Sequence, residues 1–422
     1  MRGPSDSIPR RVAIVGTGIS GLALAHVLQH DHDITLFEAA DYVGGHTHTI
    51  EVDRGGERVP VDTGFIVYNE PNYPNFSRLL RNLGIATQAT EMGFSVTNAN
   101  SGLEYSGNSL RSLFAQPGNL VSPSFHRMLV DVKRFYREAP ELLISDDRNT
   151  TLGEYLTTKK FSREFIEDHL IPFGAAIWSA APDDMYDFPA QYFVRFFDNH
   201  GFLQFRKPPW RVISHGSHTY VKAITRYLKN RIRLKCPVYS VRRKKGCVDL
   251  TTANGVEVFD AVVLAVHSDQ ALRVLSDPTE KEREILGGLA YQKNEVVLHT
   301  DVSLLPARRR AWASWNYHVP KCKTDRVAVT YNMNILQSIK ANETFCVTLN
   351  RSQDVNPDSI IRELTYHHPK YTVASLAAQS RYQEINGTNL TYYCGAYWGY
   401  GFHEDGVNSA IAVAKKFGKE WI

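Results

Sequence analysis

Two periodicities of apolar positions alternate near the N-terminus. Residues 11–15 form a short apolar run that ends at Gly16, and beyond the next glycines apolar residues recur at helical spacing up to about residue 30. Residues 33–38 form a second run with the composition of a strand. A strand, a glycine turn, a helix and a second strand within about 30 residues predict a βαβ unit, and hence a parallel sheet.

Further segments of this kind return late in the chain. Residues 260–266 are a continuous apolar run, typical of a strand that is buried on both faces. Other strands are predicted over residues 231–234, 248–252, 257–259 and 390–394, and a last helix over about 406–417. The two inserts between these blocks hold helical patterns at 75–83, 124–136 and 163–170, an aromatic-rich run at 186–210, and strand-like stretches at 294–300, 326–331 and 344–349.

We therefore predict an α/β fold with two interleaved domains. A Rossmann-type domain with a parallel sheet is assembled from three sequence segments, residues 1–64, 216–269 and 391–422. An α+β substrate domain consists of residues 65–215 and 270–390. Two domains also suit the length, because 422 residues are too many for one compact core.

Composition narrows the class of protein. With 43% hydrophobic and 22% charged residues the chain resembles an ordinary soluble protein, and a net charge of +4 is too small to predict a nucleic-acid partner. Five cysteines without a CxxC pair predict no disulfide framework, and histidines such as the pair His367 and His368 lack partners at metal-ligand spacing, so we predict no metal site. No run approaches the about 18 apolar residues of a membrane span. We expect a cytoplasmic protein, and peripheral contact with a membrane stays open.

The candidate chemistry begins with Gly16-Thr17-Gly18-Ile19-Ser20-Gly21, which matches G-x-G-x-x-G. The motif alone is weak, but here it joins a predicted strand to a predicted helix, and Glu38 follows Gly18 by 20 residues. The glycines permit a tight turn and close approach to a pyrophosphate, and the helix N-terminus supplies N–H donors. A carboxylate at Glu38 would accept hydrogen bonds from a ribose. The alternative is a glycine turn without a ligand.

A second pair of glycines, Gly44 and Gly45, follows Glu38 closely. This E-x(5)-G-G pattern resembles the glutathione-reductase-type FAD fold, in which it continues the fingerprint. No second fingerprint for NAD(P)H follows. The sequence therefore predicts an FAD enzyme that works as an oxidase or as an internally redox-neutral catalyst.

Longer motifs carry a resemblance over about residues 10–418. They include EAADYVGGHTHT (38–49), VDTGFIVYNEPNYPNF (61–76), PWRVISHGSHTYV (209–221) and YCGAYWGYGFHEDGVNSA (393–410). The chain resembles the amine-oxidase superfamily of FAD enzymes. Within it, the chain is similar to predicted NAD/FAD-binding proteins that accompany cyclopropane-fatty-acid-synthase-type methyltransferases. The resemblance implies non-covalent FAD, a hydrophobic or lipid substrate, and a fatty-acid methyltransferase as a partner.

The same resemblance assigns residues to parts of the cofactor. The expected contacts are Gly16, Gly18, Ser20 and Gly21 at the pyrophosphate, Glu38 at the ribose, Gly44, Gly45 and His46 along the dinucleotide, Thr63 and Gly64 near the isoalloxazine, Val238 at the adenine, and Glu404, Asp405, Gly406 and Val407 at the helix beneath the flavin pyrimidine. The sequence departs from the family in three ways. His46 stands where many relatives carry arginine, Gly395-Ala396-Tyr397 replaces an acidic G-[ST]-E, and the lysine expected near flavin N5 has no counterpart.

The last motif also supplies the catalytic candidates Tyr397, Trp398, Tyr400 and His403. The aromatic residues either wall an apolar substrate pocket or pack the junction of the domains, and His403 either transfers a proton or is a structural histidine. We predict an FAD-dependent oxidoreductase, a dehydrogenase, oxidase or desaturase, that takes hydride from a hydrophobic substrate such as a fatty-acyl chain. The alternatives are an amine oxidase, a flavin-dependent double-bond isomerase, and a flavin-binding accessory subunit of a lipid methyltransferase.

Overall fold

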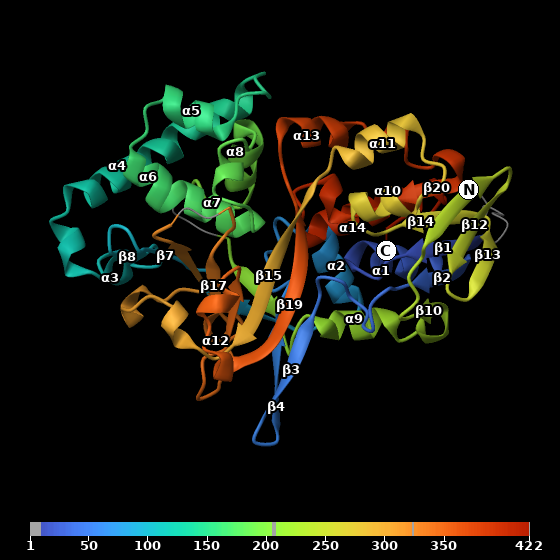
Figure 1. Cartoon of the computed structure of the whole chain (residues 1–422), viewed down its shortest axis with the longest axis horizontal. Helices are drawn as coiled ribbons and strands as arrows, with labels where there is room; N and C mark the ends of the chain where they lie inside the picture. The colour runs from blue at the N-terminus through green and yellow to red at the C-terminus, as the bar shows by residue number, and fades with distance from the viewer. Residues whose placement is uncertain (1–9, 205–207, 323–324, 422) are drawn as a thin grey trace.

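The computed structural model describes residues 10–204, 208–322 and 325–421 (Figure 1). A five-stranded parallel sheet forms one half of it, with the strand order β10-β2-β1-β14-β20. Its strands are β1 (Arg11–Val15), β2 (Asp33–Phe37), β10 (Ile232–Arg233), β14 (Ala261–Leu264) and β20 (Thr391–Tyr393). The predicted parallel sheet is thus confirmed, and its strands come from three separate stretches of the chain.

The two faces of this sheet are covered differently. Val12 and Ile14 of β1 pack with helices α1 (Ile19–Leu28), α9 (His218–Thr225) and α14 (His403–Lys416). Ala13 and Val15 point to the opposite face, toward an antiparallel sheet of β11 (Ser240–Lys244), β12 (Cys247–Thr252) and β13 (Gly255–Phe259) and helices α10 (Ser268–Val274) and α11 (Glu280–Gly287). Burial on both faces explains why these strands are continuously apolar.

A seven-stranded mixed sheet forms the other half, with the order β19-β15-β18-β17-β16-β7-β8. Its strands are β7 (Phe94–Asn98), β8 (Leu103–Ser106), β15 (Tyr291–His299), β16 (Trp315–Val319), β17 (Val329–Asn332), β18 (Cys346–Leu349) and β19 (Ile360–Pro369). One large core joins it to α4 (Pro123–Glu138), α5 (Leu152–Thr158), α6 (Arg163–Phe165), α7 (Ile171–Trp178) and α8 (Ala190–Asn199). The remaining helices are α2 (Pro74–Asn82), α3 (Leu110–Leu113), α12 (Met333–Leu336) and α13 (Val373–Ser380).

Three smaller features complete the fold. The hairpin β3 (Thr49–Arg54) and β4 (Glu57–Asp62) projects from the molecule, as Figure 1 shows. Strands β5 (Val67–Tyr68), β6 (Thr87–Thr90) and β9 (Trp210–Ile213) form a small antiparallel sheet. None of the described helices is long and apolar enough to cross a membrane.

Two sequence predictions differ from the structure at helix ends. The last helix begins at His403 rather than near residue 406, because residues 403–405 already belong to its first turn. The helix predicted over residues 163–170 continues through a π-helical turn into α7 and ends only at Trp178. Pro172 lacks the N–H that would bond to the carbonyl of Asp168, and the hydroxyl of Tyr105 donates to that oxygen instead, at 2.8 Å.

Candidate cofactor and substrate cavity

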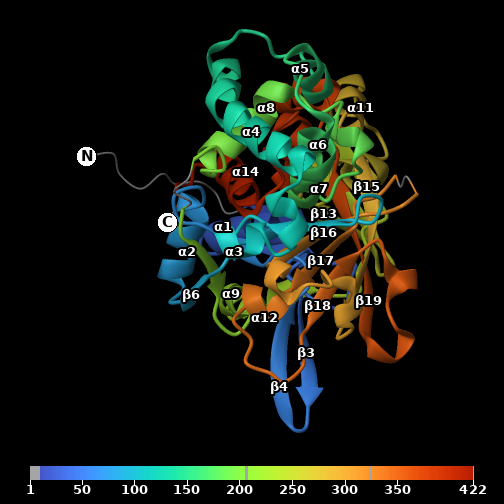
Figure 2. The same cartoon turned by 90° about the vertical axis from the view of Figure 1, so that its left-hand side faces the viewer.

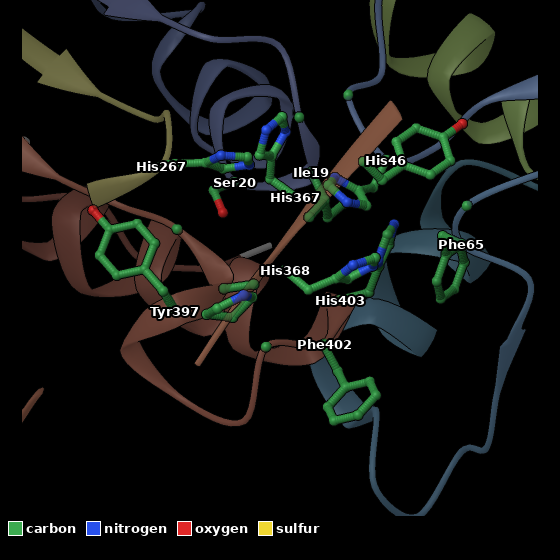
Figure 3. Close-up of a pocket in the computed structure, with 18 of the residues that line it drawn as sticks. Ile19, Ser20, His46, Phe65, His267, His367, His368, Tyr397, Phe402 and His403 are labelled. Carbon is green, nitrogen blue, oxygen red and sulfur yellow. The ribbon is translucent and has the colours of Figure 1, made fainter. Parts of the chain in front are cut away.

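A cavity of about 750 Å³ begins at the carboxyl ends of the parallel strands and reaches to the seven-stranded sheet. Residues that follow β1, β14 and β20 line it on one side, and Trp315 and Tyr331 of the seven-stranded sheet line it on the other. Open α/β folds bind their ligands at this edge of the sheet. Figure 3 shows part of the lining.

The glycine loop lies at the start of the cavity. Gly16 takes a φ of +100°, and a Cβ on Gly21 would lie 2.2 Å from the carbonyl oxygen of Gly16, so both positions require glycine. A Cβ on Gly18 would meet no atom within 4 Å and would occupy space beside the cavity. Helix α1 has neither a side-chain cap nor an acidic residue in its first turn. Its N–H groups and positive end are therefore available to a diphosphate.

Glu38 lines the cavity and also holds the glycine loop in place. Its Oε2 accepts hydrogen bonds from the Thr17 amide at 3.0 Å and the Thr17 hydroxyl at 2.5 Å, and its Oε1 accepts one from the Ala40 amide at 2.9 Å. Val238 lies in the same part of the cavity lining. Thr17 was not among the residues singled out in the sequence, although its place inside the motif beside Glu38 could have suggested it.

The second glycine pair brings another segment against the loop. Gly44 and Gly45 have positive φ values, and a Cβ on Gly45 would lie 3.0 Å from the Cα of Gly18. Gly64 packs on the carbonyl of His46, where a Cβ would lie 2.1 Å from the oxygen. The hydroxyl of Thr63 instead bonds to the carbonyl of His48 at 2.9 Å and does not line the cavity.

A group of histidines surrounds the middle of the cavity (Figure 3). The ring of His46 lies 6.1 Å from that of His267 and 5.3 Å from that of His368, while His367 lies 6.2 Å from His267. Burial, followed by the charge of neighbouring imidazoles, lowers the pKa of His46 to about 3, of His267 to about 4 and of His368 to about 3. These three imidazoles are neutral at pH 7. Among the described residues, no group of three or more His, Cys, Asp and Glu side chains is arranged to hold a metal ion.

The HEDGVNS segment contributes less to the lining than its resemblance suggests. His403 lines the cavity; its Nε2 bonds to the Thr47 hydroxyl at 3.0 Å and the Tyr220 hydroxyl at 3.1 Å, and burial lowers its pKa. Glu404 and Asp405 lie outside the lining, because both carboxylates accept backbone N–H groups. Gly406 packs on Ile19 and Ser20, and Val407 belongs to the core beneath the sheet.

The cavity continues into a chamber with aromatic walls, which we call the aromatic chamber. It is lined by Tyr73, Met92, Ile177, Trp178, Phe196, His200, Phe202, Trp210, Trp315, Tyr331, Tyr400 and Phe402. Phe196 stacks on Phe402 with ring centroids 5.1 Å apart, and Trp178 donates its Nε1 hydrogen to the carbonyl of Tyr400 at 3.3 Å. Several of these residues come from the aromatic-rich run at 186–210, so part of that run lines the cavity while the rest packs the core.

The other catalytic candidates divide between cavity and core. Tyr397 and Tyr400 line the cavity, and the buried hydroxyl of Tyr397 has no protein partner. Trp398 does not line the cavity; its ring packs on Tyr382 with centroids 4.5 Å apart. The sequence did not single out His267, which lies three residues after the end of strand β14, although the carboxyl end of a parallel strand is where such a residue is expected.

These features fit a bound dinucleotide. The uncapped start of α1 suits a diphosphate, the space beside Gly18 suits its close approach, and the buried Nε2 of His46, which has no protein partner, is free to bond to a ligand. Residues 19–314 match the model of a family described as flavin containing amine oxidoreductase. The chain belongs to this family. Its cofactor is FAD, and the protein is an FAD-dependent oxidoreductase.

Solved structures of several enzymes share the fold of this protein along nearly the whole chain. A CLA-producing fatty acid isomerase from P. acnes aligns with a TM-score of 0.69 at 17% identity, covering 98% of this chain and 100% of that one. A putrescine oxidase bound to putrescine aligns with a TM-score of 0.70 at 15% identity, covering 97% and 99% of the two chains. At such low identity these likenesses show the fold and leave the substrate open.

Curated relatives match over short segments. An L-amino acid oxidase of Cerastes cerastes is 47% identical over 51 residues, which is 12% of this chain and 10% of that protein. A flavin-containing amine oxidase A of Canis lupus familiaris is 40% identical over 78 residues, 18% of this chain and 14% of that protein. Because the matched segments span so little of these relatives, their activities are not transferred to this chain.

Proposed function

We propose that this protein uses FAD to take hydride from an uncharged, hydrophobic carbon chain, with the fatty-acyl chain of a lipid as the substrate class. The observation that carries the proposal is the absence of charge from the aromatic chamber. Glu38 and Arg273 are the charged side chains of the cavity lining within the described residues. Their chain neighbours Phe37 and Val274 pack in a core of the parallel-sheet half, whereas most rings of the chamber pack in the core of the other half. The chamber itself offers rings, aliphatic groups and a neutral imidazole.

Charge distinguishes this substrate class from the alternatives. A protonated amine loses its hydration shell on entering an apolar chamber, and it needs a carboxylate or a similar partner there to offset that loss. The carboxylate of a free fatty acid would likewise need a cation. Neither partner lines the chamber among the described residues. An acyl chain whose polar head stays outside needs no charged partner in the chamber, and it buries apolar surface against the rings.

FAD supplies a hydride acceptor when it is bound. The protein's own contribution is to exclude water and to orient the chain. The rings of Trp178, Phe196 and Phe402, which line the chamber and pack on one another, serve both purposes. A proton also leaves when a saturated chain becomes unsaturated. Burial raises the pKa of Tyr397, so its hydroxyl is protonated and can only relay this proton to water, by releasing its own as it accepts the new one. Dioxygen or another electron acceptor then takes the two electrons.

The proposal is tested by mixing the purified, FAD-loaded protein anaerobically with lipids and with amines while following the visible absorption of oxidised flavin. We expect phospholipids with long acyl chains to bleach the flavin and amines to leave it oxidised. Bleaching by an amine alone would overturn the proposal. If the flavin is not bleached but a double bond in the recovered lipid has shifted, the protein is an isomerase and the proposal fails. If neither the flavin nor the lipid changes, the proposal also fails, and the result favours an accessory subunit of a methyltransferase.

A pair of variants at one residue of the chamber wall sharpens this test. Met92 is half-buried and lines the chamber. Met92→Glu places a charge where the acyl chain would lie, so we expect at least tenfold slower bleaching by lipid, since an unpaired charge is expelled from an apolar site. Met92→Leu keeps the apolar surface and should behave like the wild type. Both variants should keep their FAD, because the glycine loop and Glu38 are unchanged.

A further inference from the structure

An exposed apolar cluster lies far from the cofactor end of the cavity. The side chains of Leu110, Leu120 and Val121 are 76%, 56% and 82% exposed. They belong to α3, to the following short helix Pro117–Leu120 and to the residue after it. Figure 1 places α3 at one end of the molecule's longest axis, and Figure 2, which turns this end toward the viewer, shows α3 and α4 on the same face. We call this surface the α3 tip.

Basic side chains surround the α3 tip. Residues 104–138 and 306–310 contain eight arginines and lysines and three carboxylates, Glu104, Asp131 and Glu138. The turn of Arg309 and Arg310 packs against α3. Some of the cations are paired, as in Arg127 with Glu164 and Arg308 with Glu104. Arg111, Lys133 and Arg310 are exposed and form no ion pair within the described residues.

This combination differs from exposed apolar residues elsewhere in the chain. Val256 and Val258, on strand β13, are 61% and 49% exposed. Glu257 lies between them and pairs with both Arg11 and Arg233, so the cations beside these valines are paired. At the α3 tip the charge is unbalanced and positive, which is the pattern by which peripheral proteins bind an anionic bilayer: apolar side chains enter the headgroup region and cations face the phosphates.

We propose that the α3 tip docks this protein on the surface of a bilayer that contains anionic lipids. Leu110, Leu120 and Val121 enter the interface, and Arg111, Lys133 and Arg310 lie against the headgroups. Binding to a bilayer requires no turnover. Failure of the docking proposal and failure of the proposed function are therefore separate results.

The test is co-sedimentation of the FAD-loaded protein with vesicles of phosphatidylcholine, alone or mixed with phosphatidylglycerol. We expect binding to the mixed vesicles, weaker binding to phosphatidylcholine alone, and loss of binding as salt is raised, because salt screens the cations. The double variant L120D/V121D should reduce the fraction bound at least tenfold. Replacing Arg111 and Arg310 by alanine should weaken binding by about fivefold for each charge removed.

The double variant V256D/V258D is the matched control, since it adds the same charges to exposed valines on β13. It should bind like the wild type. Equal binding of L120D/V121D and the wild type would overturn the proposal, as would equal loss in both double variants or no binding of the wild type to any vesicle. If L120D/V121D instead converts a dimer into a monomer and leaves vesicle binding intact, the α3 tip is a contact between copies of this chain and the proposal fails.

Discussion

The buried histidines of the cavity should make the FAD-free protein sensitive to acid, and His46 offers the clearest measurement. Its pKa falls from 6.5 in the unfolded chain to about 3 in the folded protein, with burial as the largest cause and the neighbouring His267 and His367 next. A lowered pKa means that the folded state binds its proton less readily than the unfolded state does. The stabilising effect of a neutral His46 is complete above pH 6.5 and is lost as the pH falls toward about 3.

The magnitude follows from proton linkage. Between pH 7 and about pH 5.5 the unfolded histidine takes up most of a proton while the folded one takes up none, which lowers the free energy of unfolding by about 1.3 kcal/mol. His267 and His368 have lowered pKa values for the same reason, and each adds a similar amount. The three together account for about 4 kcal/mol, a large part of the about 5–15 kcal/mol that stabilises an ordinary protein.

Two buried carboxyl groups act in the opposite direction. Burial raises the pKa of Asp405 to about 7 and that of Asp62 to about 6, so their folded forms bind protons more readily than the unfolded ones, and acid favours folding through them. Over the same pH interval these two groups together raise the free energy of unfolding by about 2 kcal/mol. The total slope therefore mixes several groups, and the contribution of His46 must be taken as a difference between variants.

The assay is urea unfolding of the FAD-free protein at both pH values, followed by tryptophan fluorescence, for the wild type and His46→Asn. The Nε2 of His46 has no protein partner, so the substitution removes no hydrogen bond at that atom. We expect the variant to lose about 1.3 kcal/mol less than the wild type on acidification. His30→Asn, at an exposed position, should keep the slope of the wild type. Equal slopes for His46→Asn and the wild type would refute the reasoning.

Three further expectations concern single side chains. Gly18→Ala should weaken FAD binding at least tenfold in a fluorescence titration, yet it should leave the stability of the FAD-free protein unchanged because its Cβ meets no protein atom. Gly21→Ala should instead destabilise the fold itself, because its Cβ would contact a carbonyl oxygen. Glu404→Ala should lower the free energy of unfolding by about 1–2 kcal/mol in urea, since its carboxylate caps helix α2. Glu282→Ala should cost about 3–5 kcal/mol, because the buried guanidinium of Arg243 would lose its partner, and a loss under 1 kcal/mol would show that the pair contributes little.

The cofactor half of the fold could be predicted from the sequence because its signals are local. The strand before Gly16, the glycine loop and the helix after it lie within about 20 residues, and backbone geometry at this loop depends on the absence of side chains at Gly16 and Gly21. The run at 260–266 predicts a central strand, and it lies beside β1 in the parallel sheet. Hairpin β3–β4 and strands β16 and β19 were not predicted, because their pairing partners are distant or their polar and apolar residues alternate weakly.

The aromatic chamber could not be assembled in this way, because its residues are contributed by segments that are far apart in sequence. Trp178 ends α7, Trp315 begins β16, and Phe402 precedes α14. No spacing in the sequence indicates that these rings meet, and each one alone is as typical of a protein core as of a binding site. The density of rings at 186–210 was compatible with a pocket wall or with core packing. In the structure some of these rings line the cavity and others pack the core.

The carboxylates of Glu404 and Asp405 explain why the chamber carries no negative charge although two acidic residues stand beside it in the sequence. Glu404 accepts the N–H groups of Asn75 and Phe76 at 3.1 and 2.9 Å, and Asp405 accepts that of Phe402 at 2.9 Å. A Cβ on Gly399 would lie 2.2 Å from Asp405, so the glycine makes room for this bond. Both carboxyl groups are thus bonded to backbone donors and neither lines the cavity, and burial raises the pKa of Asp405 to about 7, which favours its neutral form. An acidic motif in the sequence becomes the scaffold of an uncharged site, and the substrate class that we propose depends on that arrangement.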